Sequence, residues 1–62
     1  MKIVIQIEMS NAIFENSNSG NELARILRSL ANRVDGNDME DESGCNLLDI
    51  NGNKVGEFSV YD

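Results

Sequence analysis

The spacing of apolar residues changes along this 62-residue chain, and that change limits the folds it can adopt. Every second residue from Ile3 to Met9 is apolar, which is typical of a strand with one buried face and predicts a strand over about 2–9. From Leu23 to Val34 apolar residues recur at three- and four-residue intervals instead, which predicts a helix over about 20–34. The chain therefore combines both kinds of secondary structure.

The predicted helix carries signals at both ends. Ser19 and Glu22 have the spacing of a capping box, in which each side chain bonds the other residue's amide. Gly36 follows the last turn and is suited to a left-handed stop. Before this helix, the Asn- and Ser-rich residues 10–18 are typical of a turn-rich connection, with Ile13 and Phe14 folded back onto the core.

A hairpin over about 45–60 is predicted by Asn51-Gly52, a pair that tolerates positive φ. A two-residue turn would set Asp49 opposite Lys54, and a type I turn with a bulge at Gly52 would shift that register by one. The order of elements predicts a small α+β domain, β-α-β-β, with one helix packed on one face of a three-stranded sheet. The helix allows a parallel crossover between the first two strands.

One helix leaves the second face of such a sheet uncovered. In the first register Cys45, Leu47, Phe58 and Val60 point one way, and Leu48, Ile50, Val55 and Tyr61 point the other. The second set is either ordinary exposed apolar surface or the interface of a homodimer.

Length and composition exclude several classes of protein. At 62 residues the chain supports one small core, so we expect a single domain over 1–62. It has no His and a lone Cys45, expected to fill the core, so the sequence predicts no enzymatic activity, no metal site and no cofactor. The N-terminus lacks the unbroken apolar run of an export signal, and no segment is apolar enough to span a membrane, which favours the cytoplasm.

The acidic residues are concentrated. Residues 35–44 form an acidic loop with five carboxylates and no cation, within a chain of net charge −6. This charge argues against direct binding to nucleic acid or membrane and favours a basic partner protein. The loop is either a solvated surface or a row of carboxylates that imitates nucleic-acid phosphates. The candidate partner-binding residues are Asp35, Asp38, Glu40, Asp41 and Glu42, with Glu57 and Asp62 as extensions.

Three stretches, "MKIVIQIEMSNAIF", "ELARILRSLANRV" and "LLDINGNKVGEFSVYD", resemble small proteins encoded by bacteriophages and prophages. Such acidic phage products include anti-CRISPR proteins against type I effector complexes. The resemblance implies an inhibitor that acts in the host bacterial cytoplasm, binds a Cascade subunit and keeps target DNA from engaging. It assigns no contact residues. The alternative is a structural or regulatory phage protein that works as a homodimer through the uncovered sheet face.

Overall fold

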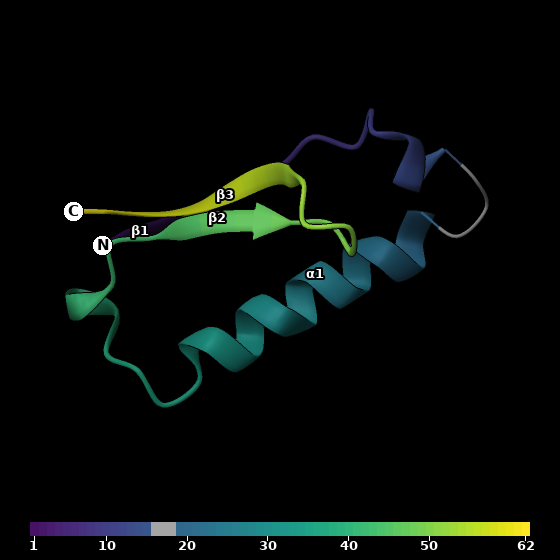
Figure 1. Cartoon of the computed structure of the whole chain (residues 1–62). Coiled ribbons are helices and arrows are strands. Elements are labelled where there is room, and N and C mark those ends of the chain that lie inside the picture. The colour runs from purple at the N-terminus through teal and green to yellow at the C-terminus, as the bar shows by residue number, and fades with distance from the viewer. Residues whose placement is uncertain (16–18) are drawn as a thin grey trace.

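The computed structural model describes residues 1–15 and 19–62 as a three-stranded antiparallel sheet with one helix against it (Figure 1). The elements in chain order are β1 (Lys2–Ile7), the 3-10 helix η1 (Ala12–Phe14), α1 (Ser19–Val34), the 3-10 helix η2 (Met39–Asp41), β2 (Cys45–Leu48) and β3 (Lys54–Tyr61). The predicted small α+β fold, β-α-β-β, is confirmed.

The predicted bounds differ at two places. The first strand ends at Ile7, two residues before the predicted end. The helix already includes Ser19, the residue that the sequence predicts as its cap. Residues 16–18, the end of the predicted turn-rich connection, lie outside the described part of the chain. At the other end α1 stops at Val34, and Gly36 follows with the left-handed φ of +83° that the sequence predicts.

The sheet order is β1-β3-β2, so the last strand lies in the middle. β3 pairs antiparallel with both neighbours, from Lys2 opposite Tyr61 on one side to Cys45 opposite Phe58 on the other. β1 and β2 are therefore parallel to each other, as the predicted crossover requires, but β3 separates them. Figure 1 shows α1 lying across one face of this sheet.

A small core fills the space between α1 and the sheet. Its buried side chains come from η1, α1, β2 and β3: Phe14, Ile26, Leu30, Leu47, Val55 and Phe58. Ile13 and Cys45 pack against this core, which confirms both sequence predictions. β1 contributes less, because Ile3 and Ile5 remain 43% and 45% exposed. The helix thus covers the β1 side of the sheet incompletely.

The hairpin combines the two registers that the sequence left open. Gly52 has a φ of +85° and donates to the Asp49 carbonyl at 3.0 Å, which closes a loop of Ile50, Asn51 and Gly52. A two-residue turn would also need positive φ at Asn51, but in the described residues only glycines have it. Leu48 accordingly pairs with Lys54. At the next pair away from the turn the register shifts by one residue. Leu47 pairs with Gly56, as it would beside a two-residue turn.

The shift leaves Val55 as an extra residue in β3, and this β-bulge changes which way β3 side chains point. For the two-residue register, Val55 was predicted to lie on the uncovered face with Leu48, Ile50 and Tyr61. That prediction is wrong, because Val55 is 5% exposed in the core, whereas Leu48 and Tyr61 are 48% and 56% exposed. The bulge rotates Val55 inward and leaves Lys54 in solvent.

The opposite burial of these two positions makes a direct test. We expect Val55→Asp to abolish folding, because an unpaired buried charge costs several kcal/mol, about the whole stability of a domain this small. Leu48→Asp places its carboxylate in water opposite Lys54 and should cost about 1 kcal/mol or less. Circular dichroism during urea titration measures both. A well-folded Val55→Asp variant would contradict the bulge.

Candidate functional site

The acidic segment that follows α1 is folded, although the sequence suggested a plain loop. The Asn37 side chain donates to the Arg33 carbonyl at 2.6 Å, which caps the end of the helix. Asp38 then caps η2, since its carboxylate accepts from the Glu40 amide at 3.0 Å. Short polar side chains that bond nearby backbone favour such turns. The local sequence therefore fixes the path of the carboxylates.

Two further contacts fasten this segment to the rest of the molecule. Met39, the first residue of η2, packs against the core. The Glu42 carboxylate accepts from Arg33 Nη2 on α1 at 3.1 Å and from the Gly44 amide at 3.1 Å. The hydrogen bond from Arg33 is the main cause that holds the pKa of Glu42 below its ordinary value. Because its side chain is only 10% exposed, Glu42 serves to anchor the segment.

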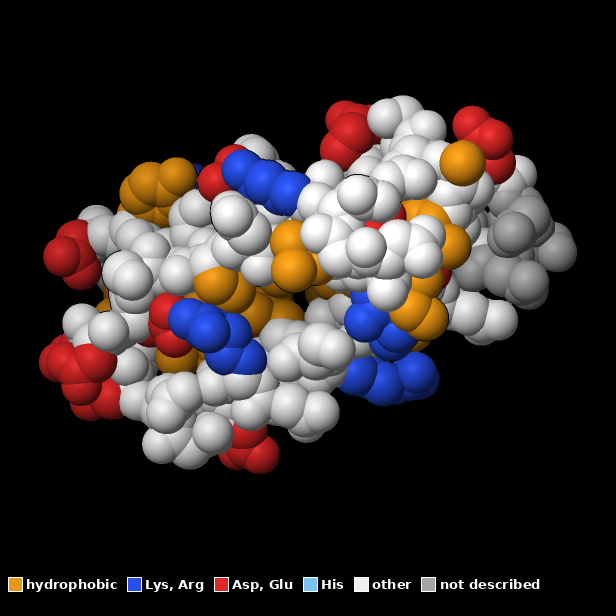
Figure 2. Space-filling model, viewed as in Figure 1, with side chains coloured by type: hydrophobic (Ala, Val, Ile, Leu, Met, Phe, Trp, Pro, Cys, Tyr) orange, Lys and Arg blue, Asp and Glu red, His pale blue; other side chains and the backbone are white. Residues whose placement is uncertain are grey.

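The other predicted binding residues divide into two groups. Asp35, Asp38, Glu40 and Asp41 are exposed on the turn and on η2. Acidic side chains gather at the left end of Figure 2, where Figure 1 places η2 and the C-terminus, so Asp62 belongs to the same end. Glu57 is exposed within β3, opposite Gln6 and Asn46, and lies apart from this end. We call Asp35, Asp38, Glu40, Asp41 and Asp62 the acidic end.

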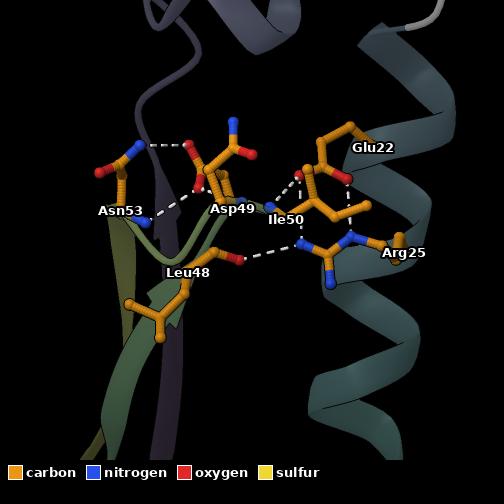
Figure 3. Close-up of polar contacts among 7 residues, drawn as sticks. Glu22, Arg25, Leu48, Asp49, Ile50 and Asn53 are labelled. Carbon is orange, nitrogen blue, oxygen red and sulfur yellow. Dashed lines mark hydrogen bonds and ion pairs between the residues drawn. The ribbon is translucent and has the colours of Figure 1, made fainter.

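Two carboxylates that the sequence did not place among the candidate site residues are buried near the start of α1. Glu22 is 9% exposed and accepts from Arg25 Nε at 2.6 Å, from Arg25 Nη2 at 3.1 Å and from the Ile50 amide at 2.9 Å (Figure 3). Arg25 also donates to the Leu48 carbonyl at 3.1 Å. The Glu22 carboxylate, predicted to return to Ser19, therefore joins the helix to the hairpin.

Asp49 organises the hairpin loop from inside. Asp49 is only 4% exposed. Its carboxylate accepts hydrogen bonds from the backbone amides of Asn51 and Asn53, both at 2.9 Å, and from the Asn11 side chain at 3.0 Å. Figure 3 shows the contacts with Asn53. The bond from the Asn53 amide is the main cause that lowers the pKa of Asp49. The alternation of Asp49, Asn51 and Asn53 around Gly52 was the signal in the sequence, since Asp before such a turn bonds the amides that follow.

The exposed carboxylates can carry electrostatic contacts with another molecule. In residues 1–15 and 19–62 no three acidic or cysteine side chains are grouped so as to hold a metal ion. No helix in the described part of the chain is long and apolar enough to cross a membrane. The exposed carboxylates of the acidic end can present negative charge to a partner.

Comparison with known proteins gives no relative: no protein family, no curated protein and no solved structure matches this chain. The fold and the positions of the carboxylates are therefore the basis for any functional assignment.

Three carboxylates that accept hydrogen bonds within the fold predict how stability depends on pH. Glu22, Glu42 and Asp49 each have a pKa below the ordinary values of 4.5, 4.5 and 3.8. Their stabilisation is therefore complete above those values and is lost as the pH falls through the lower folded-state values. We expect the urea midpoint to be level from neutral pH to about pH 5 and to fall below it.

A matched pair of variants separates this effect from general charge repulsion. Glu22→Gln removes the titrating group and the ion pair with Arg25, so its midpoint should be lower at neutral pH and should fall less in acid. Glu57→Gln removes an exposed carboxylate and should follow the wild-type profile. Equal acid sensitivity of Glu22→Gln and wild type would show that Glu22 does not contribute.

Proposed function

We propose that this protein is a phage-encoded inhibitor that binds a basic nucleic-acid-binding protein of the host, and that its acidic end occupies the site of nucleic-acid phosphates. A type I CRISPR effector complex is the partner that the sequence resemblance favours. The observation that carries the proposal is that four exposed carboxylates of residues 35–41 stand on a folded, anchored segment.

Anchoring matters because binding must overcome the loss of conformational freedom. A disordered acidic tail would have to be ordered on contact, which costs free energy. Here the packing of Met39 against the core and the ion pair between Glu42 and Arg33 already hold the segment in place. Preorganised charges on the surface give both a defined pattern and faster association with a basic groove.

The cations of the chain compensate only part of the negative charge of this end. Arg25 and Arg33, two of the five Lys and Arg residues, are paired with Glu22 and Glu42 at the helix. Lys2 lies opposite Tyr61, and Figure 1 shows the N-terminus beside the C-terminus at this end. The five carboxylates of the acidic end outnumber Lys2 and the N-terminal amine, so a partner meets mainly negative charge there.

The alternative of a homodimer through the uncovered sheet face has less support. The strand register and the exposure of Leu48 assign to that face Lys2, Val4, Gln6, Asn46, Leu48, Glu57, Ser59 and Tyr61. With Val55 in the core, five of these eight residues are polar, which leaves Val4, Leu48 and Tyr61 as the apolar side chains of this face.

The test uses a purified type I effector complex and its target duplex. We expect the wild-type protein to reduce duplex binding in a gel-shift assay, and the double variant Glu40→Gln, Asp41→Asn to require about tenfold more protein, since each surface charge pair contributes up to about 1 kcal/mol. Both residues are exposed, and Asp38, which caps η2, is left intact.

The matched control removes the same charge elsewhere. Glu15→Gln with Glu57→Gln should leave inhibition within about threefold of wild type, because both side chains are exposed away from the acidic end. Inhibition should also weaken steeply as salt rises, since surface charges are screened. Equal effects of the two double variants, or inhibition that is independent of salt, would contradict charge mimicry.

A further inference from the structure

β1 is an edge strand whose outer side meets no other strand of the sheet. The Glu8 amide donates to the Val55 carbonyl at 2.7 Å, so Glu8 directs its backbone groups toward β3. Backbone direction alternates along an antiparallel strand, so Lys2, Val4 and Gln6 also face β3. The amides and carbonyls of the odd residues Ile3, Ile5 and Ile7 therefore point outward from the sheet, where another strand can pair with them.

The sequence of this edge is complementary to itself in the antiparallel direction. Lys2 and Glu8 lie at its two ends, and both are exposed. A two-fold axis at Ile5 would set Lys2 of one copy opposite Glu8 of the other, and Ile3 opposite Ile7. Residues directly opposite each other lie on the same face of the sheet. In this register the outward amides and carbonyls of Ile3, Ile5 and Ile7 lie opposite the same groups of the other copy.

We propose that two copies of this chain associate through their β1 edges, in that register, to form a continuous six-stranded antiparallel sheet. Opposite charges directly across an antiparallel pair are stabilising and like charges are destabilising. The pairing between Lys2 and Glu8 therefore selects this register over one shifted by two residues, which would place Lys2 opposite Gln6.

Apolar surface beside β1 is covered by the same association. A groove of about 280 Å³ runs between β1 and α1, lined by Ile3, Ile5, Leu27, Leu30, Ala31, Val34, Met39 and Phe58. Leu27 is 40% exposed, close to the values for Ile3 and Ile5. A two-fold axis perpendicular to the sheet keeps both helices on one face, so the isoleucines of one copy lie next to those of the other. The uncovered part of each groove is then closed by the partner copy.

The other edge of the sheet is less suited to pairing. β2 has four residues, and the outward Leu48 carbonyl already accepts from Arg25. Edge strands that avoid pairing carry a charge near their middle or a proline. The middle of β1 is Val4, Ile5 and Gln6, without either. β1 is therefore the edge at which a second copy can bind.

The first experiment exchanges the two charges. Analytical ultracentrifugation over a concentration series gives the dimer Kd of wild type, Lys2→Glu, Glu8→Lys and the double variant. Each single exchange places like charges opposite each other twice per dimer and should raise Kd about tenfold, and the double exchange should restore it to within about threefold. Both side chains are exposed, so the fold is retained. A monomer at every concentration, or single exchanges that leave Kd unchanged, would overturn the proposal.

The second experiment reads the backbone directly. Amide hydrogen exchange by NMR should show Val4 and Gln6 protected at all concentrations, and Ile3, Ile5 and Ile7 protected only where the dimer forms. Fast exchange at Ile3, Ile5 and Ile7 in a dimeric sample would show that association uses another surface. The Glu40→Gln, Asp41→Asn variant should keep the wild-type dimer Kd, so this proposal and the inhibitor proposal can fail separately.

Discussion

β3 pairs with both other strands, and one extra residue in it decides which of its side chains reach the core. Val55 and Phe58 are both buried, yet they are three positions apart, and a regular strand would turn them to opposite faces. The bulge at Val55 changes the phase by one, so both can pack against α1. Gly56 follows directly, where a side chain would collide with the β1 backbone at Gln6. The fit of β3 in the sheet therefore depends on the extra residue at Val55 and on the absence of a side chain at Gly56.

The bulge also explains what sequence reasoning could and could not reach. Periodicity and turn chemistry predict the order of elements, the helix end before Gly36 and the packing of Phe14, because each of these depends on neighbouring residues. The direction of the Val55 side chain depends instead on the tertiary structure. The three-residue loop sets one register at the turn, and the rest of the hairpin has the other, with Val55 buried in the core. Both registers were consistent with the local sequence, and only the assembled core distinguishes them.

The candidate site shows the same division. Composition identifies the carboxylates of residues 35–42 but cannot tell that Glu42 turns toward Arg33 while Glu40 and Asp41 stay exposed. Nor can it show that Glu22 is buried between the helix and the hairpin, since the Ile50 amide that it binds is 28 residues away. The sequence shows where the acidic residues are. Their hydrogen-bond partners depend on the tertiary structure, and these partners decide whether a carboxylate supports the fold or stays exposed.

The buried carboxylates near the start of α1 and the exposed ones beyond its end are far apart. Glu22 and Val34 alone are separated by about 18 Å along the helix axis, at 1.5 Å per residue. Substitutions at such distances generally have additive effects on free energy. Substitutions at the acidic end can therefore change its pattern of charge while the junction of helix and hairpin keeps its contacts. In a chain built in this way, the surface charge can vary without a change of fold.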